Sequence, residues 1–289
     1  MKLLSPALVV TLAATIAPTS IASATDSGDS PWYSRLPLLA EEARKRGHEL
    51  PLPFGAAVVI TGLDGRKIEV TDTRIALDDN PGQSISNFVD LGSTSQVFNA
   101  NLKFDAWVLP FLNVYALVGY VHNNSLTHAQ VTVLPGGPGS ETDIETELDG
   151  LVGGVGLTLA GGYRQFFAVV DYNYNKADLG FDENFTASIA SLRAGWMGKI
   201  SDHPTQIWVG VGNWDTAATA KGHGELEDGT RFSFEADQKP KTNWMYDIGA
   251  SFEVSKRFQL VVDIGADFDG GYLFVIAPTY RFPESAANR

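Results

Sequence analysis

The sequence has no cysteine among its 289 residues. Disulfide bonds, thiol catalysis and cysteine-based metal sites are therefore excluded. Basic residues are also few, because 21 Lys and Arg stand against 34 Asp and Glu and leave a formal net charge of −13. A nucleic-acid partner requires a basic surface that neutralises phosphates, so this charge argues against nucleic-acid binding.

Long apolar runs are absent after the first 24 residues. The start of the chain combines a positive residue, Lys2, with a mostly apolar stretch at 3–17 and the small-residue sequence ASA at 22–24. This pattern predicts a secretory signal peptide at 1–24. No later stretch approaches the ~20 continuous apolar residues of a membrane helix. We therefore expect an exported protein without a helical anchor.

From Pro53 onward, the hydrophobic pattern has a period of two, which is the period of β-strands. In the stretch RFQLVVDIGADF, Val262 and Phe268 lie on one face, whereas Asp263 and Asp267 lie on the other. A soluble sandwich also alternates in this way, with its apolar face inward. The runs here last ten or more residues, close to the ~9–11 that a tilted strand needs to cross a bilayer. The length of these runs favours strands that face lipid.

Aromatic residues gather at the ends of the expected strands, as they do in the interfacial girdles of membrane barrels. The residues in question are Trp244, Phe258, Phe268, Tyr272, Tyr280 and Phe282. The core of a sandwich has no reason to place aromatics at both rims. The distribution therefore supports a transmembrane β-barrel.

The connections between the expected strands alternate between short and long, as the periplasmic turns and outer loops of such barrels do. Short turns are expected at 110–112, 161–164, 201–205 and 255–257, and long polar loops at about 63–94, 123–145, 175–184 and 218–240. The expected strands are 53–62, 96–109, 113–122, 147–160, 165–174, 185–199, 205–216, 242–254, 258–268 and 272–282. The sequence thus predicts an all-β fold, a transmembrane antiparallel barrel at 53–282. It has ten strands, or twelve if LDGRKIEV at 63–70 is a hairpin tip.

The segment at 25–52 differs from the barrel. Apolar residues recur at helical spacing from Leu36 onward, Pro37 suits a first helical turn, and Gly47 suits a stop. These features predict a short amphipathic helix at about 36–46. It could cap the periplasmic mouth, lie on the membrane surface, enter the lumen, or only order the N-terminus.

The stretch GGYLFVIAPTYRF at 270–282 places a large apolar or aromatic residue at almost every second position. A final strand of this kind, ending in Phe282, resembles the C-terminal signature strand of Gram-negative outer-membrane barrels. DAWVLPFLNVYALVGYV at 105–121 also resembles a segment of small proteobacterial barrel proteins of unassigned function. Two features depart from this pattern: a tail at 283–289 follows the aromatic residue, and Pro278 interrupts the strand.

This resemblance implies an outer-membrane location. It implies contact with outer-membrane lipid and lipopolysaccharide, and insertion by the barrel assembly machinery. Small solutes are the further class of partner that the architecture suggests. The resemblance carries no active-site residues.

Charged residues on the predicted inward face would line the lumen: Lys103, Asp105, Asp171, Arg193, Asp247, Glu253, Asp263, Asp267 and Arg281. A barrel of ~10 strands has space for little more than its own side chains. Ion pairs that fill the lumen are therefore favoured over a solute pathway, because buried charges usually pair to offset desolvation.

Three-residue hairpin loops near the C-terminus would fix the register of the final strands. They would place Gly249 beside Asp263 and Asp247 beside Gly265, so that each carboxylate has a glycine neighbour and room for a water or a long basic side chain. The same loops would bring Glu253, Gln259 and Arg281 into one row near the periplasmic end.

The stretch ETDIETELD at 141–149 is strongly acidic, and 122–149 has no Lys or Arg. Its alternating acids, Asp143, Glu145, Glu147 and Asp149, would form one column of like charge in an extended chain. Oxygen ligands of this kind suit Ca²⁺ or Mg²⁺ at the outer surface. A solvated acidic loop without metal is the preferred interpretation, since an EF-hand pattern is absent.

His122 lies at the outer end of an expected strand, near Ser125. Outer-membrane lipases, lipid A deacylases and omptin-type proteases place His with Ser or Asp at this rim, so the two residues are weak catalytic candidates. Residues three apart on a strand point to opposite faces unless the chain turns. No G-x-S-x-G elbow, H-E-x-x-H motif or P-loop is present, and no motif indicates a cofactor.

Three functions remain open. A narrow channel or transporter for small solutes, with lumen charges that set its selectivity, ranks first by a small margin. The alternatives are a closed structural or surface-interaction barrel that acts through its acidic loops, and a rim enzyme that hydrolyses lipid or peptide. The ranking rests partly on analogy between folds, which does not determine function.

Overall fold

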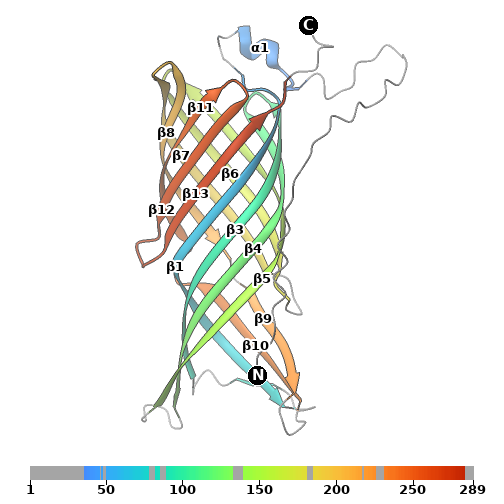
Figure 1. The fold of residues 1–289 in the computed structure, drawn as a ribbon, viewed down its shortest axis with the longest axis vertical. Coiled ribbons are helices and arrows are strands. Elements are labelled where there is room, and N and C mark those ends of the chain that lie inside the picture. Colours follow the sequence, from blue (N-terminus) through green and yellow to red (C-terminus); the bar gives the residue numbers. More distant parts are fainter. Residues whose placement is uncertain are drawn as a thin grey trace, which may run out of the picture.

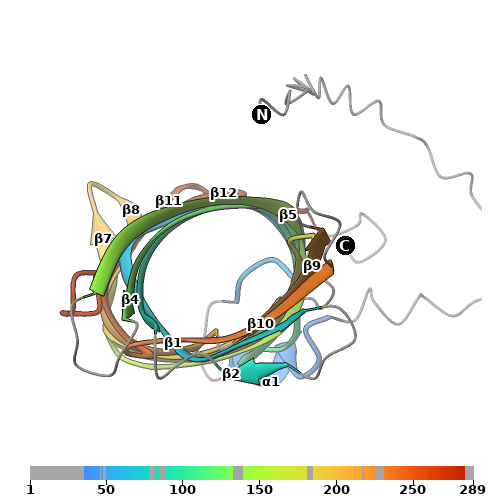
Figure 2. The same ribbon diagram turned by 90° about the horizontal axis from the view of Figure 1, so that it is seen from below.

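Ten strands close an antiparallel β-barrel in the computed structural model (Figures 1 and 2). The structure describes residues 36–45, 47, 50–77, 82–84, 89–132, 139–180, 185–216, 218–225 and 231–283. The closed wall consists of β1 (Phe54–Leu77), β3 (Val89–Leu109), β4 (Leu112–Thr132), β5 (Gly139–Tyr163), β6 (Phe166–Asp178), β7 (Phe185–Ile200), β8 (His203–Asp215), β11 (Trp244–Ser255), β12 (Phe258–Ala266) and β13 (Tyr272–Arg281). β13 pairs back onto β1, which confirms the predicted ten-stranded barrel. The expected signal peptide lies outside the described residues.

Tight turns gather at one end of the barrel, at the top of Figure 1, which we call the turn end. They lie at 110–111, 164–165, 201–202 and 256–257. The helix α1 (Ala40–Lys45) lies at the same end, where the amide of Leu38 donates to the carbonyl of Val108 at 2.9 Å. The helix begins later than predicted, because Leu39 has a φ of 65°, which an α-helix does not accept. We call the opposite end of the barrel the loop end.

The wall extends much farther toward the loop end on one side than on the other. β1, β3, β4 and β5 are 24, 21, 21 and 25 residues long, whereas β12 has only 9. The long loops predicted at 63–94 and 123–145 are therefore largely strand, and these two predictions are wrong. Polar residues lie on both faces of these segments, so their sequence lacks the hydrophobic alternation of the other strands. The hydrogen-bonded pairing between the strands nevertheless continues through them.

A further hairpin lies within the loop predicted at 218–240. It consists of β9 (Ala218–Glu225) and β10 (Arg231–Pro240), and β10 pairs with the outer half of β1 beyond the tip of β13. A two-residue strand, β2 (Gln83–Ser84), also pairs with β1. The alternative of a hairpin tip at 63–70 is wrong, because that stretch lies inside β1, where a bulge accommodates it.

The predicted register between β11 and β12 is confirmed, since Gly249 pairs with Asp263 and Asp247 with Gly265. The predicted register between β12 and β13 is wrong by two residues, because Gln259 faces Thr279 rather than Arg281.

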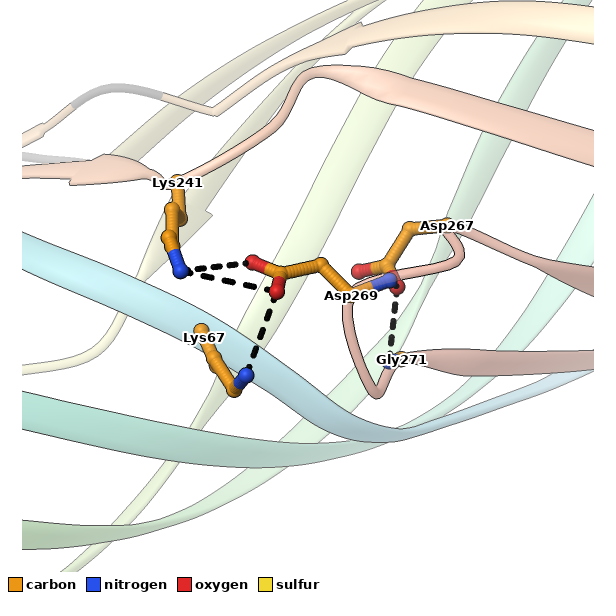
Figure 3. Close-up of polar contacts among 5 residues, drawn as sticks. All are labelled: Lys67, Lys241, Asp267, Asp269 and Gly271. Carbon is orange, nitrogen blue, oxygen red and sulfur yellow. Dashed lines mark hydrogen bonds and ion pairs between the residues drawn. The ribbon is translucent and has the colours of Figure 1, made fainter.

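The cause of this difference is a longer hairpin loop than the three residues expected. The side chain of Asp267 closes it by accepting from the amides of Asp269 at 2.8 Å and Gly271 at 2.7 Å (Figure 3). At the tip, the carboxylate of Asp269 lies between Lys67 of β1 at 3.2 Å and Lys241, which precedes β11, at 3.3 Å. These contacts attach the β12–β13 hairpin to the neighbouring strands.

The two faces of the wall have opposite character. Aliphatic side chains in the middle of strands point outward, with Val118 at 55%, Val155 at 61% and Val209 at 63% exposure. Polar side chains on the inner face are buried, with Asp263 at 2% exposure. An apolar outer belt over a polar interior is the pattern of a barrel solvated by lipid. Among the described residues, no helix has the length and apolar character needed to span a membrane.

Candidate functional site: the lumen and the outer rim

The lumen contains a cavity of about 790 Å³. On β3, every second residue from Ser93 to Asp105 lines it, and on β4 the lining extends from Tyr115 to Thr127. Because these residues lie at successive levels of the ladder, the cavity runs along most of the barrel. A closely packed interior would leave no such space.

One group of ion pairs spans β8 along the inner wall, from β7 to β11 and β12. The guanidinium of Arg193 lies 3.4 Å from Asp247 and 2.9 Å from Asp263, whose side chains are only 5% and 2% exposed. Gly210 of β8 makes room, because a Cβ there would collide with an oxygen of Asp247. Gly249 accommodates the ring of Trp208 in the same way. The sequence predicted these charges in the lumen, but not which cation would bridge the two carboxylates.

A second ion pair lies closer to the turn end. Arg281 of β13 donates to Asp105 of β3, which also accepts from Asn113 Nδ2 at 2.7 Å. The pair passes over Gly55 of β1, where a Cβ would meet Arg281 Nη1 at 2.5 Å. Only a glycine permits this contact between strands that are not direct neighbours.

Two further lumen charges have neutral partners. Lys103 Nζ lies 3.9 Å from the ring centroid of Tyr115. The hydroxyl of Tyr115 donates to Asp171 at 2.8 Å, and Thr158 donates to the other oxygen at 2.6 Å. Within the described part of the chain, neither Lys103 nor Asp171 has an oppositely charged side chain within 4 Å. Both residues line the cavity, so their fields act on whatever enters it.

Toward the loop end, the lining is mostly uncharged. Asn101 is 7% exposed, and its Oδ1 has no hydrogen-bond partner, as is also true of Asn99 and Asn175. Arg66 and Lys239 are the charged exceptions among the described lining residues, and the guanidinium of Arg66 donates to the carbonyls of Trp214 at 3.0 Å and Thr242 at 3.3 Å. Sequence reasoning missed Arg66 because its position lay in a predicted loop.

Four of the nine predicted lumen charges do not line the cavity: Asp247 and Asp263, which pair with Arg193 as described above, and Asp267 and Glu253. Asp267 closes the β12–β13 hairpin, as described above. Glu253 lies opposite Gln259 near the turn end, where its backbone carbonyl is 3.0 Å from Nδ1 of His203. Their environments indicate structural roles.

The outer face of β4 and β5 carries the acidic column beyond the apolar belt. His122 Nδ1 lies 2.7 Å from Asp149 Oδ1, and its Nε2 lies 3.8 Å from Glu147 Oε1. Hydrogen bonds from Tyr120 and then from His122 lower the pKa of Asp149. The β4–β5 ladder has no register shift, so these acids share the outward face of Leu151 and stand above the belt rather than turning inward.

The acidic column continues farther out with a second histidine–carboxylate pair. His128 Nδ1 lies 2.6 Å from Asp143 Oδ1, and Glu145 accepts from Asn124 at 3.4 Å. Sequence reasoning found the acids but not their histidine partners, because the cross-strand register was hidden in a predicted loop.

The structure does not bring His122 and Ser125 together. Ser125 points inward, lines the cavity and accepts from Asn123 at 3.1 Å, whereas His122 lies on the outer face. The partner of His122 is the carboxylate of Asp149 on the next strand. His122 and Ser125 therefore do not form a catalytic pair.

The closed antiparallel wall, apolar outer belt and polar lumen define an outer-membrane β-barrel. The sequence matches no protein-family model and no curated protein. The structure is similar to outer membrane protein OprG from Pseudomonas aeruginosa, with 12% identity, a TM-score of 0.41, and coverage of 81% of this chain and 98% of that chain. It is also similar to the outer membrane protease OmpT from Escherichia coli, with 9% identity, a TM-score of 0.42, and coverage of 80% of this chain and 97% of that chain. A third similar structure is the toluene transporter TbuX from Ralstonia pickettii, with 12% identity, a TM-score of 0.33, and coverage of 82% of this chain and 90% of that chain. These similarities concern the fold alone.

Proposed function

We propose that this protein is a narrow outer-membrane channel for small solutes. The observation that carries the proposal is the cavity along the lumen, which extends from Arg281 near the turn end to Thr127 and Lys239 near the loop end. Its unpartnered amide oxygens offer hydrogen bonds that water or a polar solute would satisfy. The mostly neutral lining at the loop end suits small uncharged or weakly charged solutes.

The selectivity of such a channel would depend on the lumen charges that lack ionic partners. Lys103 attracts anions and Asp171 attracts cations, and the two lie on either side of Tyr115. Arg193 offsets part of the negative charge of Asp247 and Asp263, and neither carboxylate lines the cavity, so the two contribute less to the field in the pore.

The ion pairs on the inner wall favour the alternative of a closed barrel. Arg281 with Asp105, and Arg193 with Asp247 and Asp263, place charged side chains along the interior. A channel must therefore conduct past these pairs, whereas a closed structural barrel would be sealed by them.

Single-channel conductance in a planar bilayer tests the proposal on the folded mature protein. We expect discrete steps in the wild type, a lower anion-to-cation permeability ratio in Lys103→Gln, and a higher ratio in Asp171→Asn. Lys176→Gln is the matched control, because Lys176 is an exposed residue on an outward-facing position of β6. A control that changes the ratio as much as Lys103→Gln would contradict the assignment of Lys103 to the pathway.

A double variant distinguishes a channel from a sealed barrel. Asp105→Asn with Arg281→Gln removes both charges of the turn-end pair and shortens the side chain at 281, so a channel should show larger conductance steps. Silence from both folded proteins, the wild type and the double variant, would overturn the channel and support the closed barrel.

A further inference from the structure

We propose that His122 and Glu147 bind a divalent transition-metal ion of the Zn²⁺ class on the outer face of the barrel, with Asp149 as the carboxylate that orients the histidine ring. Their donor atoms all lie within 4.8 Å of one another. The gap of 3.8 Å between His122 Nε2 and Glu147 Oε1 is close to the separation of two ligands that share an ion at ~2.0–2.2 Å. Small side-chain rotations would therefore complete the site.

The position of Asp149 is that of a carboxylate in a metal site. Its Oδ1 lies 2.7 Å from His122 Nδ1, which orients the ring and leaves Nε2 directed toward Glu147. A carboxylate on the second ring nitrogen is the usual way in which proteins fix the orientation of a metal-binding histidine.

The charge around the site also favours a cation. Glu145 and Asp143 continue the same column, and 122–149 contains no Lys or Arg. Side by side on one strand face, these carboxylates repel one another, and a bound divalent ion would offset that repulsion. The cross-strand neighbours of the column, Asn124 and His128, bring no permanent positive charge.

A groove of about 490 Å³ adjoins His122 on the side away from Glu147 and Asp149, which do not line it. It lies across β13, β1, β3 and β4, and His122 and Asn124 form part of its wall. Gly62 forms part of its floor, and a Cβ there would meet nothing within 4 Å. The groove brings solvent to His122, so an ion bound there keeps coordination positions open to water.

The imidazole nitrogen decides the class of metal. Ca²⁺ and Mg²⁺ prefer sites built from oxygen alone, whereas imidazole with carboxylates suits Zn²⁺ and its neighbours in the transition series. The acids at 141–149 alone suggested an oxygen-only site. The β4–β5 register adds His122 to Glu147 and Asp149 and so changes the expected ion.

Isothermal titration calorimetry of the detergent-folded protein with ZnCl₂ tests the site. We expect one equivalent of Zn²⁺ to bind, and affinity to fall at least tenfold in His122→Gln and in Glu147→Gln. CaCl₂ should bind much more weakly. The matched control is His128→Gln, which changes another carboxylate-paired histidine on the same face and should leave the affinity unchanged.

Several results would overturn the proposal. The wild type could fail to bind Zn²⁺, or His122→Gln could bind it with unchanged affinity. The His128 control could lose as much Zn²⁺ affinity as His122→Gln, or the wild type could bind Ca²⁺ as tightly as Zn²⁺. The side chains changed here are partly or fully exposed, so the variants should fold, and heat-dependent migration on a gel verifies this before titration. An upward shift of the unfolding temperature that saturates with Zn²⁺ would support the site independently.

Discussion

The bridge from Arg193 to Asp247 and Asp263 gives a quantitative test of how the lumen is stabilised. Arg193→Gln removes the only cation that the described residues place within 4 Å of these two carboxylates. Asp263 and Asp247 are 2% and 5% exposed, so water cannot replace the guanidinium without rearrangement. Breaking a buried pair by removing one partner typically costs ~3–5 kcal/mol, because an uncompensated charge remains.

Two considerations adjust this magnitude. The side chain of Arg193 is 31% exposed, and the cavity beside it can admit water, so we expect a loss of about 3 kcal/mol, at the lower end of that range. Adding Asp263→Asn removes one of the stranded charges and replaces it with a neutral group of nearly the same shape. The double variant should therefore recover more than half of the loss, which is the signature of a coupled pair.

Urea or guanidinium unfolding in lipid vesicles, followed by tryptophan fluorescence, measures these differences. Arg164→Gln is the control, because Arg164 lies in an exposed turn and contacts only the ring of Tyr163 at 5.4 Å among the described residues. It should change the free energy of unfolding by less than about 0.5 kcal/mol. A loss below about 1 kcal/mol in Arg193→Gln, or no recovery on adding Asp263→Asn, would refute the inference that Arg193 stabilises the two buried carboxylates.

Three further predictions concern the wall and its ends. Val262→Arg, on the outer face of β12, should cost about 2–4 kcal/mol or block folding, whereas Val261→Arg, which points into the cavity, should be tolerated better. Equal amounts of folded protein in the two variants would contradict the inward and outward assignment. Deletion of 25–50 should leave the barrel able to assemble in membranes, and loss of assembly would show that the helix is part of the fold. Hydrogen bonding to Lys67 lowers the pKa of Asp269, so its contribution to stability is present above the pKa of an unfolded aspartate and is lost as the pH falls through the lower folded value. A pH series of unfolding midpoints should show a smaller acid-side decrease in Asp269→Asn, and an unchanged profile would speak against this contact.

Much of the barrel could be predicted from the sequence because lipid imposes a strict local rule. Each membrane-facing strand must alternate, so Val262, Ile264 and Phe268 on one side and Asp263 on the other define a face without any knowledge of the neighbours. The rule fails beyond the belt, where water contacts both faces and alternation is no longer required. The outer parts of β4 and β5 were therefore predicted as loops, although they continue the ladder.

The candidate sites divide in the same way. The sequence alone determined that Lys103, Arg193 and Asp263 face inward and that 141–149 is acidic, because the face of a residue follows from its parity along a strand. Only the tertiary structure decided that Arg193 bridges two carboxylates and that His122 faces Asp149. Pairing between strands depends on register, and register depends on loop lengths and turn contacts such as those of Asp267, which shifted β13 by two residues from its predicted place. The face that a residue occupies depends on its own strand alone, whereas a site depends on how several strands align.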